Sequence, residues 1–193
     1  MIFEIFLISL FSYISGSIPY GLIVTKLFLN QDIRKVGSKN IGATNVLRAG
    51  NKFYAILTLW FDIFKGFAPI IITNHYFPNL IYLSGMMAFL GHIFPVWLKF
   101  KGGKGIATYL GIVLALSLKL GLIFCLSWII TVLITKYSSL SSIISALVIF
   151  LISFFESNLE LNFFLFSTFV IIIYTHRQNI IRLKNKTEDK IKL

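Results

Sequence analysis

The chain has 193 residues, of which 57% are hydrophobic and 13% are charged, and its formal net charge at pH 7 is +11. Soluble domains carry about a quarter charged residues, so this composition excludes an ordinary soluble domain and indicates an integral membrane protein. The positive charge therefore suggests membrane orientation, anionic lipid or an anionic substrate, and we expect no nucleic-acid partner. The single cysteine, Cys125, lies in an apolar run and cannot form an internal disulfide.

Hydropathy predicts an all-α integral membrane protein in which seven transmembrane helices form a single domain over residues 1–193. A spanning helix needs about 20 apolar residues. The predicted spans are 3–28, 53–73, 80–98, 106–118, 120–135, 139–155 and 160–176. The fourth and fifth spans divide one apolar run that Ser117, Lys119 and Gly121 interrupt. A single tilted helix there would be the alternative, giving six spans.

Two features refine the first span. It lacks a basic segment at its start and carries Glu4 there, so we expect that it is not a cleaved signal peptide. Pro19, within GSIPYG, should kink it.

The basic residues favour seven spans. Fifteen of the 18 lysines and arginines then fall on one side of the membrane. They are Arg34, Lys35, Lys39, Arg48 and Lys52; Lys99, Lys101 and Lys104; Lys136; and Arg177, Arg182, Lys184, Lys186, Lys190 and Lys192. Because basic loops stay in the cytoplasm, we expect the N-terminus outside and the C-terminus in the cytoplasm.

The first polar cluster is the segment 36–50, with the sequence VGSKNIGATNVLRAG. Its Gly, Ser, Asn and Thr residues favour turns and local hydrogen bonds to the backbone. Such a segment can present N–H groups and hydroxyls to an anion. An ordinary solvated loop explains the same residue types equally well.

The second polar cluster packs three lysines and three glycines into residues 99–105. Glycine lets the backbone approach a ligand closely, and lysine supplies a point charge for phosphate. The segment is not a Walker A loop, because Leu98 stands where the first glycine is required and Gly105 follows Lys104. A cytoplasmic anchor with a glycine turn is the alternative.

The third polar cluster, YTHRQNIIRL, ends the last span. His176 and Asn179 are three residues apart and would share a helix face. The alternative is a helix end at which basic residues complement the dipole. Within the membrane, Asp62 and Lys65 are also three apart, and we expect an ion pair, while His92 is expected to organise the loop that follows it.

The sequence lacks the usual motifs for metal or serine chemistry. It has no His-Glu-x-x-His, no carboxylate cluster and no Gly-x-Ser-x-Gly, and no histidine begins a His-x-x-x-x-Asp motif. We therefore expect no metal and no cofactor.

Five segments resemble the bacterial acyl-phosphate:glycerol-3-phosphate acyltransferase family (PlsY). In chain order they are GSIPYG, DIRKVGSKNIGATNVLR, GHIFPVWLKFKGGKGIAT, YSSLSSI and HRQNIIRL. The resemblance implies a seven-helix enzyme of the bacterial cytoplasmic (inner) membrane. It would transfer an acyl group from acyl phosphate to the 1-hydroxyl of glycerol 3-phosphate, giving lysophosphatidic acid and phosphate, at the cytoplasmic face. The implied partners are these two substrates and membrane lipid, with no obligate protein partner.

The resemblance also implies roles for individual residues. The catalytic set would be Ser38, Arg48, Lys104, His176 and Asn179. The substrate-binding set would be Asn40, Thr44, Asn45, Lys101, Gly102, Gly103, Gly105, Ser141 and Ser142. Glu188 matches an acidic residue with a structural role, although the preceding tail lacks the glycine that the family often carries. Lys39 stands where the family often has glycine, which makes that turn less permissive.

With an already activated acyl donor, the enzyme would need mainly positioning and electrostatic stabilisation of the departing phosphate. Direct attack by the glycerol hydroxyl is expected, with either a substrate phosphate or His176 accepting the proton. A transporter for a phosphorylated solute, a metal-dependent phosphatidyltransferase and a membrane scaffold are the alternatives. Against the first two, the chain shows no inverted repeat of broken helices and has only Asp62 as an aspartate within a span.

Overall fold

The structure is a computed structural model that describes residues 1–191, and these residues contain helices but no strand. The chain divides into two compact units, Met1–Leu116 and Ser117–Leu193. The first unit contains α1 (Ile2–Ser17), α2 (Tyr20–Leu29), α3 (Ala43–Arg48), α4 (Lys52–Tyr76), α5 (Ile81–Ile93) and α6 (Ile106–Leu116). The second contains α7 (Leu118–Thr135), α8 (Ser138–Ser153), α9 (Leu159–Thr175) and α10 (Arg177–Lys184). Short 3₁₀ turns lie at Ile33–Lys35, Pro78–Leu80, Val96–Leu98 and Phe154–Glu156.

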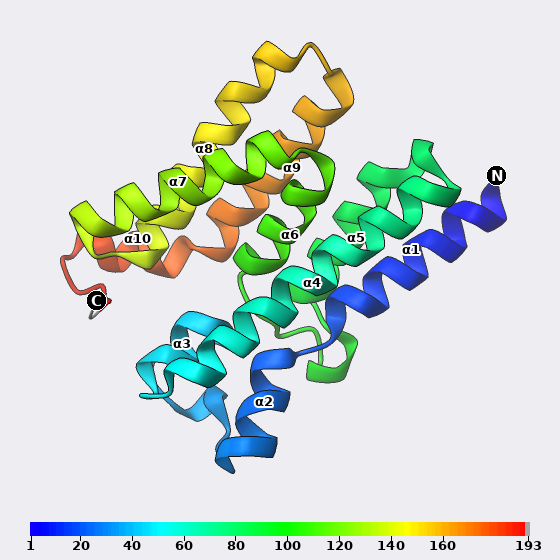
Figure 1. Ribbon diagram of the computed structural model, residues 1–193. Helices are drawn as coiled ribbons and strands as arrows, with labels where there is room; N and C mark the ends of the chain where they lie inside the picture. Colours follow the sequence, from blue (N-terminus) through cyan, green and yellow to red (C-terminus); the bar gives the residue numbers. More distant parts are fainter. Residues whose placement is uncertain (192–193) are drawn as a thin grey trace. The chain divides into compact units, whose positions relative to one another are not determined.

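In the first unit, α5 packs against α1 and α4, and α4 also packs against α6 (Figure 1). Glycines make these approaches close. A side chain at Gly16 of α1 would collide with the Ala88 carbonyl of α5, and one at Gly111 of α6 would collide with the Ile63 carbonyl of α4. Small residues at helix contacts are typical of membrane helices, which gain their association energy from close packing.

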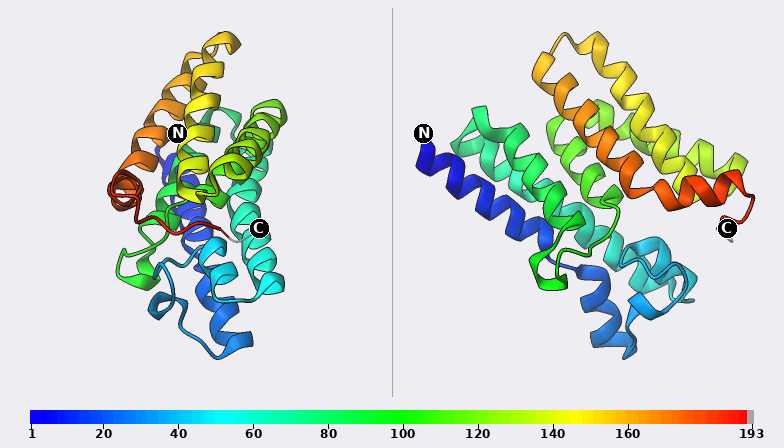
Figure 2. Two further views of the ribbon diagram at one scale, coloured as in Figure 1. Left: turned by 90° about the vertical axis from the view of Figure 1, so that its left-hand side faces the viewer. Right: turned by 180° about the vertical axis from the view of Figure 1, so that it is seen from behind.

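In the second unit, α7, α8 and α9 lie side by side, with α8 contacting both of the others (Figure 2). Phe150 of α8 packs its ring parallel to Phe169 of α9, with 6.1 Å between centroids. Trp128 of α7 donates from Nε1 to Ser142 Oγ of α8 over 3.2 Å. Large apolar side chains such as Leu133 remain exposed, as expected for surfaces that face lipid.

The predicted kink in the first span is a complete break. α1 ends at Ser17 and α2 begins at Tyr20, with Pro19 in a non-helical conformation between them. The predicted division of the run 106–135 is also confirmed. Ser117 is extended and caps α7 by accepting a hydrogen bond from Leu120 N, so the alternative of one continuous helix is wrong.

The predicted span 80–98 corresponds to the apolar stretch Pro78–Leu98, which is long enough to cross a membrane, but its helix is interrupted, and the predicted span 106–118 ends two residues early. Within the span 80–98, α5 ends at Ile93, because Pro95 has no N–H group and restricts Phe94. α6 has 11 residues, which at 1.5 Å per residue is roughly half of a bilayer core. By length and apolar composition, the described residues provide five helices able to cross a membrane, or six if α9 and α10, bent by 59°, form one span.

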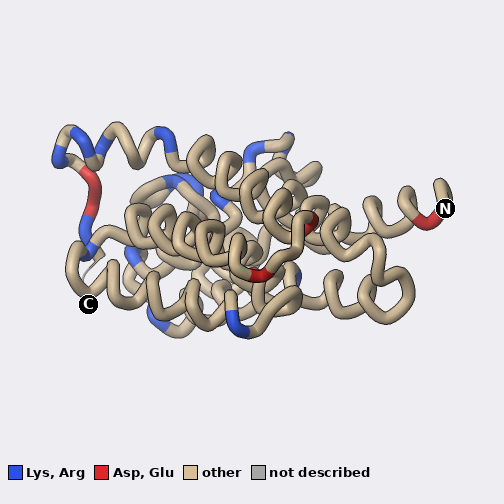
Figure 3. The backbone as a smooth tube through the Cα atoms, turned by 90° about the horizontal axis from the view of Figure 1, so that it is seen from above, with Lys and Arg blue, Asp and Glu red and all other residues tan. Residues whose placement is uncertain are grey.

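Charges are sparse along these helices, and most of the backbone carries none (Figure 3). The predicted intramembrane ion pair is present, with Lys65 Nζ 2.8 Å from Asp62 Oδ1. In the second unit, Lys119 pairs with Glu156 over 2.7 Å. The sequence predicts that both residues lie on the external side of the membrane.

Candidate active site

The segment between α2 and α4 is a folded element with a small core of its own. Ile33, Ile41 and Val46 are buried together with Leu22 of α2 and Ala55 of α4. An ordinary solvated loop would not bury three of its own apolar side chains, so the structure favours a shaped loop over that alternative.

Asn45 is the hub of this loop and is 1% exposed. Its Oδ1 accepts a hydrogen bond from Ser38 N over 2.9 Å. Its Nδ2 lies within 3.1 Å of three carbonyl oxygens, those of Ile33, Val36 and Asn40. Both the oxygen and the nitrogen of the Asn45 amide therefore hydrogen-bond to the loop backbone, and these bonds hold the backbone around Ser38 in place.

The other first-cluster residues lie around this hub. Ser38 is half-buried and sits between two residues in the left-handed conformation, Gly37 with φ 53° and Lys39 with φ 60°. Asn40 accepts a hydrogen bond at Oδ1 from Gly42 N over 3.1 Å. Thr44 and Arg48, both half-buried, lie at the start and end of α3. All five residues that the sequence assigned to this loop lie within it, and Asn45 contacts the backbone of Ser38 and of Asn40. The five are Ser38, Asn40, Thr44, Asn45 and Arg48.

The glycine-rich segment packs directly on the end of α5. Gly102 N donates to the Ile93 carbonyl over 3.0 Å, and Gly103 N donates to the His92 carbonyl over 3.1 Å. A Cβ at Gly102 would collide with the His92 carbonyl, and one at Gly103 with the His92 ring. These two N–H groups therefore hold the segment to α5.

The lysines of the segment lie on either side of these glycines. Lys101 is exposed and Lys104 is half-buried. Gly105 follows with φ 83°, where a side chain would collide with the Phe89 ring. The segment therefore presents lysine side chains from a backbone that is fixed by close packing.

In the second unit, the serine-rich turn opens α8. Ser141 and Ser142 are buried, and their hydroxyls donate to the carbonyls of Tyr137 and Ser138, one turn earlier. Each hydroxyl oxygen can still accept a hydrogen bond. Their neighbour Ser139 makes the longer-range contact, which the sequence did not single out: its Oγ donates to Glu188 over 2.8 Å.

His176 lies at the bend between α9 and α10 and is 2% exposed. Its Nδ1 is 2.9 Å from the Ile172 carbonyl oxygen. A carbonyl can only accept, so Nδ1 carries the proton, and in the neutral ring Nε2 is the nitrogen with the lone pair. The backbone thus fixes the tautomer of His176.

Asn179 and Glu188 meet in the same unit. Asn179 Nδ2 donates to Glu188 Oε1 over 2.6 Å, and Arg182 Nε donates to Oε2 over 2.7 Å. Burial raises the pKa of the Glu188 carboxyl, but the hydrogen bonds from Arg182, Asn179 and Ser139 outweigh it and hold that pKa below its usual value. The structural role implied for Glu188 is confirmed, because its carboxylate ties the C-terminal segment to α8 and α10.

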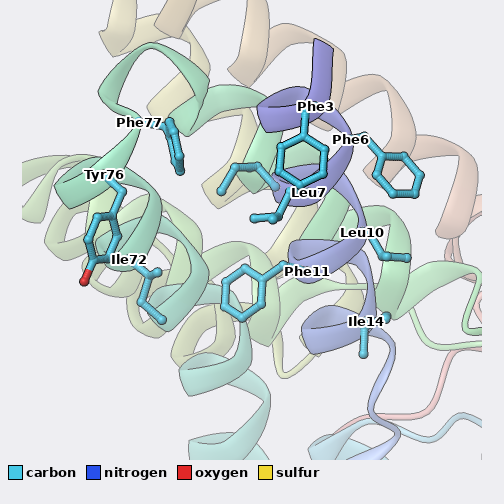
Figure 4. Close-up of a pocket in the computed structure, with 10 residues that line it drawn as sticks. Phe3, Phe6, Leu7, Leu10, Phe11, Ile14, Ile72, Tyr76 and Phe77 are labelled. Carbon is cyan, nitrogen blue, oxygen red and sulfur yellow. The ribbon is translucent and has the colours of Figure 1, made fainter. Parts of the chain in front are cut away.

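An apolar groove in the first unit contains none of the predicted site residues. It has a volume of about 470 Å³ and lies between α1 and the end of α4 (Figure 4). Its lining residues are Phe3, Phe6, Leu7, Ile8, Leu10, Phe11, Ile14, Ile72, Tyr76 and Phe77. With no charged side chain, such a surface suits hydrocarbon and not a phosphate.

Among residues 1–191 no group of three or more His, Cys, Asp and Glu side chains could hold a metal ion. The potential ligands for a phosphate are instead the lysines, Arg48 and the hydroxyls described above.

Comparison with known proteins gives consistent matches over the full length. The family profile described as glycerol-3-phosphate acyltransferase matches residues 6–186. The glycerol-3-phosphate acyltransferase of Pelagibacter ubique is 50% identical over 190 residues, covering 98% of this chain and 99% of the relative. That of Mesorhizobium japonicum is 44% identical over 191 residues, covering 99% of this chain and 98% of the relative.

Two solved structures are similar to the chain as well. Both are crystal structures of PlsY, described as an integral membrane glycerol 3-phosphate acyltransferase. The glycerol 3-phosphate form matches with a TM-score of 0.93 and 38% identity, covering 98% of this chain and 96% of that one. The lysophosphatidic acid form matches with a TM-score of 0.91 and 36% identity over the same shares.

Proposed function

The chain belongs to the glycerol-3-phosphate acyltransferase family, and we propose that it transfers a fatty acyl group from acyl phosphate to the 1-hydroxyl of glycerol 3-phosphate. The products are 1-acylglycerol 3-phosphate, which is lysophosphatidic acid, and inorganic phosphate. The observation that carries this proposal is the full-length match to PlsY in two forms, one with glycerol 3-phosphate and one with lysophosphatidic acid. These two compounds are the acceptor and the product of the proposed reaction.

The donor is chosen on chemical grounds. An acyl phosphate is a mixed anhydride, so phosphate leaves readily once the carbonyl is attacked. Catalysis then requires orientation of two substrates and stabilisation of negative charge. Lys101, Lys104 and Arg48 supply positive charge for the phosphate groups.

The proposed chemical step is direct attack. The glycerol 1-oxygen forms a bond to the acyl carbon, the anhydride C–O bond breaks, and phosphate departs with the electron pair. His176 accepts the hydroxyl proton at Nε2, or a phosphate oxygen of the donor does so. The tautomer imposed by the Ile172 carbonyl supports the first route, since it places the lone pair of the neutral ring on Nε2.

The remaining roles follow the local geometry. Ser38, Asn40 and Thr44 offer polar side chains to the donor phosphate, while Asn45 acts through the shape of their loop. Gly102, Gly103 and Gly105 permit the close packing that holds the two lysines. In the second unit, Ser141 and Ser142 offer acceptor oxygens, and Asn179 orients substrate. We propose that residues 1–193 work as one acyltransferase domain, because the family match runs through both units.

Seven membrane crossings are also proposed, with α6 as a short one, the N-terminus outside and the C-terminus in the cytoplasm of the bacterial inner membrane. Single cysteines in a Cys125→Ala background test this. Asn79→Cys and Lys119→Cys should react with a membrane-impermeant maleimide in intact cells, and Lys184→Cys should not. If α6 does not cross, Lys119→Cys will be protected.

The reaction itself is tested with the purified full chain in detergent, labelled glycerol 3-phosphate and palmitoyl phosphate. Labelled lysophosphatidic acid is the expected product. A protein that binds glycerol 3-phosphate but forms no product would favour a transporter instead. Trapping an acyl group on Ser38 during turnover would rule out direct attack, and unchanged turnover in His176→Ala would remove His176 as the proton acceptor.

A further inference from the structure

A buried charged cluster in the first unit has no part in the catalytic and substrate-binding roles proposed above. Asp62 and Lys65 of α4 form an ion pair in which both side chains are 2% exposed. His92, at the end of α5, has its Nδ1 3.9 Å from Asp62 Oδ1 and 3.0 Å from Thr108 Oγ1 of α6. Charges at membrane depth are costly and are usually paired or functional. The cluster thus links α4, α5 and α6 through polar and charged side chains that are costly to bury in a membrane.

His92 connects this cluster to the glycine-rich segment. Its carbonyl accepts the hydrogen bond from Gly103 N, and its ring occupies the space next to Gly103 where a Cβ would have to sit. The ring is fixed on its other side by Thr108. A shift of the His92 ring would therefore move Gly103 and the adjoining Lys104.

Lys65 connects the same cluster to the break between α1 and α2. Its Nζ donates to the Ile18 carbonyl over 2.7 Å and lies 5.7 Å from the centroid of the Tyr20 ring. α2 leads directly into the loop that contains Ser38. Lys65 of the ion pair therefore contacts the backbone that precedes the loop containing Ser38. His92, next to Asp62, contacts the 101–105 segment.

We propose that the cluster of Asp62, Lys65 and His92 is a positioning device, in which His92 fixes the 101–105 segment for the phosphate group of glycerol 3-phosphate. None of the three touches substrate. A purely stabilising ion pair would need neither the hydrogen bond to Gly103 nor the ring packed against it. This inference rests on the proposed function, since it assigns the segment to the acceptor.

The first test compares steady-state kinetics of full-length His92→Ala with wild type. We expect KM for glycerol 3-phosphate to rise about tenfold or more while kcat stays within about threefold, because the binding segment is displaced and the chemistry is not. His92→Asn should raise KM in the same direction, since its short amide can still meet Thr108 but leaves the space beside Gly103 empty. Thr58→Val is the matched control: Thr58 is fully buried on α4, one turn before Asp62, and its Oγ1 has no hydrogen-bond partner among the described residues. It should leave KM unchanged.

The second test is a double-mutant cycle. Gly103→Ala alone should raise KM, because its Cβ meets the His92 ring. In a His92→Ala background that ring is absent, so adding Gly103→Ala should change KM by less than about threefold. If His92→Ala does not fold, His92→Asn replaces it, because the asparagine side chain does not extend to the position of Nε2.

The two tests also separate this inference from the proposed function. Additive effects of Gly103→Ala and the His92 substitution, or an unchanged KM in His92→Ala, would overturn the positioning role in an active enzyme. A wild-type protein that makes no lysophosphatidic acid would overturn the proposed function instead.

Discussion

The side-chain nitrogen of Asn179 lies 2.6 Å from Oε1 of Glu188, a residue nine positions further along the chain. The same oxygen accepts a hydrogen bond from Ser139, so one carboxylate holds both the proposed substrate-orienting residue and the start of α8. A further hydrogen bond joins the C-terminal segment to the turn between α7 and α8, where Ile191 N donates to the Lys136 carbonyl over 2.8 Å. The position of Asn179 therefore depends on the tail that follows it.

Replacing Glu188 should weaken this arrangement. Glu188→Gln removes the charge that pairs with Arg182 and turns one acceptor into a donor, so we expect the free energy of unfolding to fall by roughly 1–3 kcal/mol. Acyl transfer should also fall, because the one remaining acceptor oxygen cannot serve both Asn179 and Arg182. Thermal unfolding in detergent measures the first effect. Glu160→Gln, at an exposed position in the first turn of α9, is the control, and an equal loss of stability there would contradict this role for Glu188.

The stability contributed by Glu188 should depend on pH. Its pKa in the folded protein lies below the usual 4.5, so folding favours the ionised form. This contribution is fully present above about pH 4.5 and is lost as the pH falls through the folded pKa. The difference in Tm between wild type and Glu188→Gln should therefore be constant from pH 7 to 5 and shrink below about pH 4.5. A difference that grows in acid would contradict the lowered pKa.

Asn45 should be needed for the shape of the first loop. Asn45→Ala leaves the Ser38 N–H and three carbonyls without this partner, and we expect it to cost roughly 2–4 kcal/mol of stability, because each buried polar group left unsatisfied costs about 1–3 kcal/mol. Activity should fall at least tenfold. Asn45→Asp, which keeps the acceptor for Ser38 but not the donors, should lie between alanine and wild type. Wild-type activity in Asn45→Ala would show that the loop does not need this hub.

Lys39 should be a site where glycine stabilises the protein. It has φ 60°, a conformation that costs an L-residue about 1 kcal/mol and costs glycine much less. Lys39→Gly should therefore raise the free energy of unfolding by up to about 1 kcal/mol. Lys35→Gly removes the same charge at a position in a 3₁₀ turn where φ is not positive, and it should destabilise. Loss of stability in both variants would mean that the Lys39 side chain contributes more than its backbone costs.

Local features of this fold were predictable from the sequence. The Asp62–Lys65 pair follows from a spacing of three residues on one helix, and the breaks at Pro19 and Ser117 follow from backbone and capping chemistry. The contact between Asn45 and the backbone of Ser38 lies within one short segment, which the sequence also marks as a polar cluster.

Contacts between distant segments were not predictable in this way. No local pattern pairs Ser139 with Glu188, or sets Gly103 against the His92 ring, because both contacts depend on how helices pack. Hydropathy also could not show the interruption within the span 80–98, where α5 ends at Ile93 and a 3₁₀ turn follows, and it placed the end of the span 106–118 two residues beyond the end of α6. Apolar character continues past a helix end, whereas the helix stops where backbone hydrogen bonding fails.

We propose acyl phosphate as the donor and glycerol 3-phosphate as the acceptor, and we expect the step to need no metal. The most direct measurement supplies the purified full chain with labelled glycerol 3-phosphate and either palmitoyl phosphate or palmitoyl-CoA, with EDTA present throughout. We predict labelled lysophosphatidic acid from palmitoyl phosphate alone, at the same rate with and without EDTA. Equal product from palmitoyl-CoA, or loss of product in EDTA, would contradict the claim.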